Sequence, residues 1–269
     1  MNKIALIFDF DETLVEESTT AFIESLGVNS KKFWEETNNG LMQQDWDPVP
    51  AYMFKLIELS LKSEKTRITK QKLQNFAKKV VYKKGLLELF NNLRKHTKEK
   101  LQDTSIEFYI ISSGIGEIIR YTAIAKEFSD IWASDYEYQK NGEILFPKRL
   151  LSFTDKTRYI FQISKGQIGE KFRNKPYIVN EKVLPGTYRT PINNMIYIGD
   201  GMTDVPCFSL IKRFGGTPIA VYDAQNMKAY GKAWGFIKDG RVSNLHSADY
   251  SVGSDLYNTI IMAINSVTE

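Results

Sequence analysis

Two carboxylates, Asp9 and Asp11, follow directly on the short apolar run Ile4–Phe8 near the start of the chain. An apolar run that ends so sharply in polar residues predicts a buried strand. Because side chains alternate along an extended chain, we expect both carboxylates to point the same way. Like charges on one face repel, unless a cation or a shared proton lies between them. The pattern therefore indicates a cation site, acid–base chemistry or both.

Two further apolar runs end in polar residues in the same way. Residues 106–111 lead into Ser112, and residues 195–198 lead through a glycine into Asp200. The carboxyl ends of parallel strands lie at one edge of a sheet, where open α/β sheets bind ligands. We therefore expect one cleft to collect the following side chains: Asp9, Asp11, Thr13, Ser112, Asp200 and Asp204.

This set has the groups needed for phosphoryl transfer through a covalent intermediate. Asp9 can attack phosphorus as the nucleophile, and Asp11 can protonate the leaving oxygen and then activate water. Mg²⁺ prefers oxygen ligands, so the expected ligands are Asp9, Asp200 and the backbone carbonyl of Asp11. Asp204, at the start of a helix, can support the metal or its waters.

A second group of residues can bind the phosphate. Ser112 and the N–H groups of Ser113 and Gly114, at an expected helix start, form an anion cradle. The hydroxyl of Thr13 is a further candidate, and Lys156, also near a helix start, adds a positive charge for the phosphate oxygens. Purely structural interpretations stay open: the serines can cap a helix, the acidic residues can form turns, and other basic residues lie close to Lys156.

Two kinds of pattern divide the chain. Strand-like runs alternate with helical patterns over residues 104–269, which predicts an α/β fold with a parallel sheet and helices on both faces. Residues 17–103 carry apolar residues at helical spacing, which predicts an α-helical insertion. We therefore expect a catalytic core of residues 1–16 and 104–269 and an inserted cap of residues 17–103. A hairpin over residues 131–146 and a last strand at residues 248–252 are also expected.

Composition narrows the class of protein. The 269 residues are 42% hydrophobic and 25% charged, which is typical of a soluble globular protein. The net charge of +4 fits an anionic small substrate and gives little reason to expect nucleic acid. The single cysteine excludes an intrachain disulfide. No apolar run is long enough for a membrane span or a signal peptide, so we expect a cytoplasmic protein without a membrane partner.

Four motifs together resemble those of the haloacid dehalogenase-like hydrolase superfamily. They are Asp9–Thr13, Ser112, Lys156 and Gly199–Asp204, in the family's order. The resemblance implies a Rossmann-like core, Mg²⁺ dependence and an aspartyl-phosphate intermediate. The helical insertion resembles the C1 cap of phosphoserine-phosphatase-like members. Asp11 is typical of phosphatases and mutases in this superfamily, and haloalkanoate dehalogenases lack it.

The residues expected to recognise the substrate differ from those of true phosphoserine phosphatases. There, an acidic cap residue holds the substrate amine, whereas Ser18 occupies that place here, next to Glu17. Segment 43–61 also lacks an arginine that could bind the substrate carboxylate. Trp46 and Tyr52 either line a cap surface that faces the cleft or pack within the cap. Phosphoserine is therefore not the expected substrate.

The leading hypothesis is a Mg²⁺-dependent phosphatase that acts on a small-molecule phosphomonoester. A phosphomutase is the nearest alternative. A nucleic-acid end phosphatase would use the basic helix around residues 70–84, and a phosphate-binding module would have lost catalysis. The presence of Asp11 argues against the last of these, because a phosphate binder needs no acid–base group.

Overall fold

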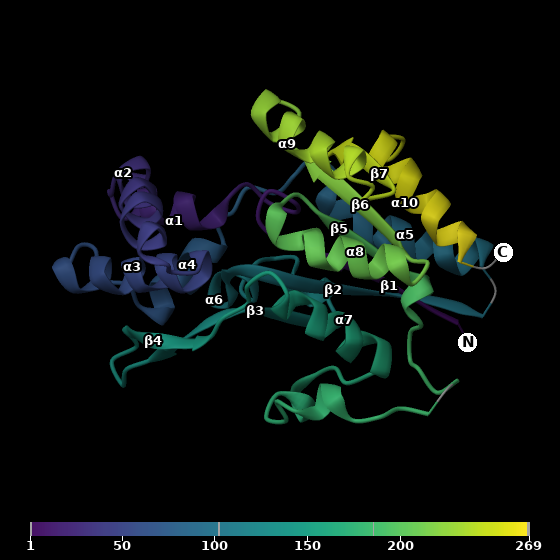
Figure 1. Ribbon diagram of the computed structural model, residues 1–269, viewed down its shortest axis with the longest axis horizontal. Helices are drawn as coiled ribbons and strands as arrows, with labels where there is room; N and C mark the ends of the chain where they lie inside the picture. Colours follow the sequence, from purple (N-terminus) through teal and green to yellow (C-terminus); the bar gives the residue numbers. More distant parts are fainter. Residues whose placement is uncertain (1, 102, 185, 268–269) are drawn as a thin grey trace.

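A seven-stranded sheet organises the computed structural model, which describes residues 2–101, 103–184 and 186–267 (Figure 1). Neighbouring strands are parallel, except that β4 runs antiparallel to β3. In sheet order the strands are β4 (Ile144–Arg149), β3 (Asp130–Tyr138), β2 (Thr104–Ile115), β1 (Asn2–Phe8), β5 (Met195–Gly199), β6 (Thr217–Tyr222) and β7 (Asn244–Ser247). The strand that leads into the two carboxylates therefore lies at the centre.

Helices cover both faces of this sheet, because the side chains of β1 alternate between two cores. Ile4, Leu6 and Phe8 belong to one core, and Ala5 and Ile7 belong to the other. The first core is completed by α5 (Leu86–Lys100) and α10 (Asp255–Ser266), and the second by α7 (Asp155–Lys165), α8 (Val205–Arg213) and α9 (Met227–Lys238). The α/β fold with helices on both faces is as predicted.

Four more helices gather beyond one end of the sheet, above the projecting β3–β4 hairpin (Figure 1). They are α1 (Ser18–Ser25), α2 (Ser30–Glu35), α3 (Pro48–Lys62) and α4 (Lys70–Ala77). They form a third core, in which Phe22, Leu56 and Leu73 share contacts with Tyr136 of the hairpin and with Ile118 of α6 (Gly116–Ile119). The core-and-cap division at residues 17–103 stays a proposal. Because α5 packs on the sheet, we propose that the cap ends before it.

The last strand lies four residues earlier than predicted. β7 pairs with β6 up to Ser247, and residues 248–252 are irregular and lead into a turn instead of forming a strand. The carboxylate of Asp249 accepts a hydrogen bond from the backbone N–H of Ser251, and the Ser254 hydroxyl donates to the carbonyl of Asp249. These local bonds compete with strand pairing. The predicted hairpin is confirmed, since β3 and β4 flank the turn at Asn141–Gly142.

Within the described residues, no helix combines the length and the apolar character that a bilayer span requires.

Candidate active site

Two adjacent strand ends bring three carboxylates together. The backbone N–H of Asp9, just after β1, donates to the carbonyl of Ile198 in β5 at 2.9 Å. Asp200 follows β5 directly, and a short 3₁₀ helix (Met202–Asp204) turns the chain back. Oxygens of Asp9, Asp200 and Asp204 lie within 4.8 Å of one another. The strand ends therefore bring these three side chains together, as expected.

A buried lysine lies between two of these carboxylates. Lys156, in the first turn of α7, has no exposed surface. Its Nζ lies 2.7 Å from Asp204 Oδ1 and 3.1 Å from Asp9 Oδ1. Burial works to lower the pKa of this ammonium group, but Asp204 and Asp9 outweigh it and hold the pKa above its ordinary value. Lys156, rather than one of the basic residues near it, therefore contacts Asp9.

The carboxylate of Asp204 is fixed by hydrogen bonds on both oxygens. Besides the contact with Lys156, Oδ1 accepts from the hydroxyl of Tyr197 at 2.8 Å, and Oδ2 accepts from the N–H of Gly201 at 3.1 Å. A Cβ on Gly199 would lie 2.5 Å from Oδ2, so this glycine permits the close approach. The sequence pattern did not identify Tyr197, although a tyrosine within an apolar strand needs a partner for its hydroxyl.

The charges of this cluster fit a hard divalent cation. Burial, and then the nearby Asp204, raise the pKa of Asp9 to about 6 against the opposing effect of Lys156. Asp9 and Asp204 share Lys156 as an ion-pair partner, and Asp200 brings a third carboxylate close to them. Oxygen ligands with excess negative charge are the environment that Mg²⁺ takes in proteins. Asp9 and Asp200 belong to this acidic cluster, and their role as metal ligands stays a prediction.

Asp11 lies in a different environment. Its Oδ1 accepts a hydrogen bond of 2.7 Å from the backbone N–H of Ser18, at the start of α1. Burial, and then the charge of Glu17, raise the pKa of Asp11 to about 8. A Cβ on Gly114 would lie 2.6 Å from Asp11 Oδ2, so the end of β2 also approaches this carboxylate. The start of α1 and the end of β2 therefore both approach Asp11. Among the described residues, no lysine or arginine forms an ion pair with it.

Glu17, predicted as a specificity residue, serves first as a helix cap. Its carboxylate accepts from the backbone N–H groups of Thr19 and Thr20 at 3.2 and 2.5 Å. Burial raises its pKa, which those hydrogen bonds oppose. Ser18 lies beside it, and its hydroxyl is buried and has no hydrogen-bond partner among the described residues. Both residues therefore lie next to Asp11, as candidates for contact with the part of a substrate beyond the phosphate.

The residues of the predicted phosphate cradle lie in the last part of β2 and not at a helix start. β2 continues to Ile115 because it still pairs with β3 there, and α6 begins only at Gly116. The N–H of Gly114 donates to the Ser112 hydroxyl at 3.0 Å and is thus engaged. The hydroxyls of Ser113 and Thr13 are buried, and neither has a hydrogen-bond partner within the described segments. These two hydroxyls are available to donate to an anion.

The two aromatic candidates differ in their position. The hydroxyl of Tyr52, in α3, donates to the carbonyl of Ser113 at 2.7 Å, so this side chain reaches the cleft. Trp46 is 37% exposed, and its ring packs on Phe54 at 5.1 Å between centroids. Among the described residues, Trp46 makes its ring contact with Phe54 and not with a residue beside the carboxylates. Tyr52 therefore remains a specificity candidate, whereas nothing in the geometry supports Trp46.

Comparisons with known proteins agree with this geometry. A family model described as Putative Phosphatase matches residues 4–214. An uncharacterized protein of Borreliella burgdorferi is 28% identical over 290 residues, which cover 98% of this chain and 97% of the relative.

Two solved structures share the fold over almost the whole chain. A HAD family hydrolase of Salmonella enterica serovar Typhi has a TM-score of 0.63 at 15% identity, covering 97% of this chain and 70% of that one. A phosphoserine phosphatase in its apo form has a TM-score of 0.60 at 14% identity, covering 96% and 98%. At these identities the likeness shows the fold alone, and the predicted Rossmann-like α/β fold is confirmed.

Proposed function

Because the chain belongs to the family described as Putative Phosphatase, we propose that it hydrolyses a small phosphomonoester with the help of Mg²⁺. The family match also confirms the sequence-based prediction of a haloacid dehalogenase-like phosphatase. The observation that carries the proposal is the contrast between two neighbouring aspartates. Asp9 lies 3.1 Å from the ammonium group of Lys156, whereas burial raises the pKa of Asp11 to about 8. One is placed to act as an anion and the other as an acid.

In the first half-reaction, an ionised oxygen of Asp9 attacks phosphorus. A new bond forms between phosphorus and Asp9, and the bond from phosphorus to the leaving oxygen breaks. Asp11 donates its proton to that oxygen, and the alcohol departs. The raised pKa of Asp11 supports this role, because a carboxyl group with an ordinary pKa would carry no proton at neutral pH.

In the second half-reaction, Asp11 is ionised and accepts a proton from water. The water oxygen attacks phosphorus, the bond from phosphorus to Asp9 breaks, and inorganic phosphate leaves. Asp11 regains its proton and Asp9 its charge, so that both aspartates return to their starting states.

Several fixed groups would bind the phosphate and the metal. Lys156 and the hydroxyls of Thr13, Ser112 and Ser113 would contact phosphate oxygens. Ligands of the Mg²⁺ would be Asp9, Asp200 and the backbone carbonyl of Asp11, with Asp204 held in support by the bonds that fix it. When bound, Mg²⁺ would neutralise the carboxylates and the phosphate together. The leaving group would extend toward Glu17, Ser18 and Tyr52.

The test is hydrolysis of p-nitrophenyl phosphate and a panel of small phosphate esters, with Mg²⁺ and with EDTA. We expect turnover by the wild type with Mg²⁺, and a loss of about a thousand-fold or more in Asp9→Asn. The matched control is Asp45→Asn, because Asp45 is exposed and has a left-handed backbone that asparagine also adopts. Acid-quenched enzyme should carry phosphate on Asp9 that hydroxylamine releases.

Two results would contradict the proposal. If the wild type shows no activity on any ester of the panel, the protein is no phosphomonoesterase of this kind. If Asp9→Asn and Asp45→Asn retain equal activity, Asp9 is not the nucleophile.

A further inference from the structure

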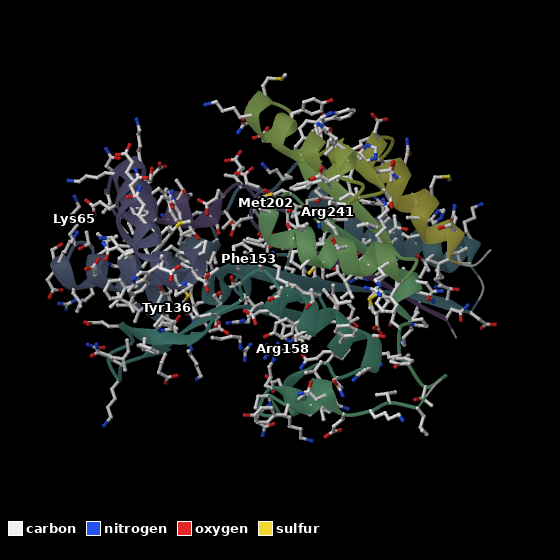
Figure 2. All side chains as sticks on the ribbon, viewed as in Figure 1. Lys65, Tyr136, Phe153, Arg158, Met202 and Arg241 are labelled. Carbon is white, nitrogen blue, oxygen red and sulfur yellow. The ribbon has the colours of Figure 1, made fainter. Side chains whose placement is uncertain are left out.

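A second polar cavity lies outside the cleft, where the chain after α7 folds back over β3. It has a volume of about 110 Å³. Four cations line it: Arg149 of β4, Arg158 of α7, and Arg173 and Lys175 of the segment that follows α7. Figure 2 shows Arg158 between α7 and that segment. We call this space the arginine cavity.

The carboxylates near the arginine cavity balance only part of its positive charge. Arg173 pairs with Asp130, whose oxygens also accept from the backbone N–H groups of Ile131 and Gly169. Arg149 lies 3.7 Å from Asp135, which also pairs with Arg120.

Arg158 and Lys175 form no ion pair with a carboxylate among the described residues. Arg158 donates instead to the neighbouring hydroxyl of Tyr159, and Lys175 lies 5.7 Å above the ring of Phe172. Arg158 is half-buried and Lys175 is exposed, so within the described part of the chain neither cation already has a carboxylate partner that a ligand would have to displace.

One donor in the arginine cavity lacks an acceptor. The Nε of Arg158 is buried and has no hydrogen-bond partner within the described part of the chain. A buried donor without an acceptor is costly, and a ligand that supplies one removes that cost. The guanidinium is held in place by stacking on Tyr159, whose ring in turn stacks on Trp132 at 5.0 Å. The Tyr159 ring thus fixes the guanidinium, while the buried Nε still needs an oxygen acceptor.

We propose that the arginine cavity binds a phosphate group, either as free phosphate or on a small metabolite. A phosphate dianion can pair with Arg158 and Lys175, and its oxygens suit the forked donors of arginine. The volume of the cavity is sufficient for a tetrahedral oxyanion. This inference is independent of the proposed catalytic function, since none of the four cations is assigned to the cleft.

Binding here would link two parts of the chain that are distant in sequence. Arg149 and Arg158 belong to a strand and a helix of the core, whereas Arg173 and Lys175 come from the segment after α7. That segment already contacts the sheet through Arg173 and Gly169 on Asp130. A bound anion would add a second attachment. We therefore expect ligand binding to stabilise this segment against proteolysis.

The test is equilibrium dialysis with ³²P-labelled inorganic phosphate at fixed ionic strength, in EDTA, with the full chain. A matched pair of lysines flanks one ring: Lys171 and Lys175 lie 5.0 and 5.7 Å from the centroid of Phe172. Only Lys175 lines the cavity. Lys175→Gln is therefore the test variant and Lys171→Gln its control, with Arg158→Gln as a second test. Competition by phenylphosphonate separates free phosphate from a phosphate ester as the preferred ligand.

We expect Lys175→Gln and Arg158→Gln to weaken one class of phosphate site about tenfold or more, because each removes a charge-assisted hydrogen bond. Lys171→Gln should bind phosphate as the wild type does. Inhibition of hydrolysis by phosphate, measured separately, should stay unchanged in Lys175→Gln.

Two results would overturn the proposal. Phosphate binding that stays unchanged in both test variants would mean that phosphate binds in the catalytic cleft alone. An equal loss of binding in Lys171→Gln would mean diffuse attraction to a basic surface. Circular dichroism of each variant establishes that it is folded.

Discussion

Two pairs of carboxylates meet at the end of β1, and they are stabilised in different ways. Asp9 and Asp204 are joined by the buried ammonium group of Lys156. Within residues 2–101, 103–184 and 186–267, no lysine or arginine pairs with Asp11 or Glu17; they accept backbone hydrogen bonds at the start of α1. Burial raises the pKa of Asp9 to about 6 but that of Asp11 to about 8.

The difference shows how an anion and an acid can lie two residues apart at the end of one strand. A fixed cation keeps a buried carboxylate ionised, whereas a proton neutralises a carboxylate that lacks one. The assignment of Asp9 as nucleophile and Asp11 as acid depends on this contrast. Each of the following changes tests one side of it.

Removal of the cation should have the largest effect. Lys156→Gln leaves Asp9 and Asp204 buried and uncompensated, so we expect activity to fall about a thousand-fold or more. We also expect the free energy of unfolding to fall by about 3–5 kcal/mol. Lys148→Gln is the control, because Lys148 is exposed and its pair with Glu137 contributes little. Steady-state rates measure the loss of activity, and thermal melts measure the loss of stability. If Lys156→Gln is as active and as stable as the wild type, the two carboxylate pairs do not differ in the way proposed.

Asp11→Asn should slow hydrolysis by a factor of about 10²–10⁴ for esters with poor leaving groups, because the proton donor is lost. The same substitution should stabilise the metal-free protein. The pKa of Asp11 is about 8 in the folded protein, above the ordinary 3.8. As pH rises from about 4 to 8, the unfolded chain therefore ionises at Asp11 while the folded protein keeps the proton, and the free energy of unfolding falls.

Asparagine does not ionise, so in EDTA this variant should gain stability over the wild type across that range and reach a constant advantage above it. The gain should be at least about 1 kcal/mol, since one pKa unit corresponds to about 1.4 kcal/mol. Urea denaturation at several pH values measures the difference. A difference that does not depend on pH would mean that Asp11 titrates as an ordinary carboxyl group.

Gly114→Ala tests the enclosure of Asp11 without altering a charge. The added Cβ would lie 2.6 Å from Asp11 Oδ2 and would displace that carboxylate. A misplacement of this size should lower kcat about 10- to 100-fold. Gly231→Ala is the matched control, because the Cβ there meets nothing within 4 Å. Equal kcat values in the two variants would show that the position of Asp11 is not critical.

The smallest effect is expected from Tyr52→Phe. It removes the hydrogen bond from α3 to Ser113, at a cost of about 1 kcal/mol in stability. Tyr136→Phe removes a similar bond of 2.8 Å to the carbonyl of Met53, away from the strand end. Both variants should melt at lower temperature, but only Tyr52→Phe should alter KM, by a few-fold. A similar change of KM in both would mean that α3 acts only through its packing.

The parts of the site that sequence could predict are those set by local pattern. Asp9 and Asp200 follow short apolar runs, and parallel strands bring their ends together whatever the connections. Lys156 was predicted through the family resemblance, and its burial between two carboxylates agrees with that assignment.

The parts that could not be predicted depend on contacts distant in sequence. Tyr197 was not identified as the residue that holds Asp204, because a strand pattern does not say which buried hydroxyl finds a carboxylate. The bond from Tyr52 to Ser113 joins a helix to a strand 61 residues away. The sequence also could not place Trp46, because an aromatic residue in such a loop can either face a cleft or pack within the cap. In the structure its ring packs on Phe54.

The central place of β1 has a consequence for how the chain folds. β3 and β4 pair across a short turn, with Tyr138 opposite Ile144, whereas Asn2 of β1 pairs with Thr104 of β2. Closing so long a loop costs entropy before any contact compensates for it, so we expect the hairpin to form early and β1 to join late. That cost rises only with the logarithm of length, by about 0.6 kcal/mol for each doubling. The segment between Asp9 and β2 can therefore lengthen or shorten considerably while the strand that leads into Asp9 keeps its place.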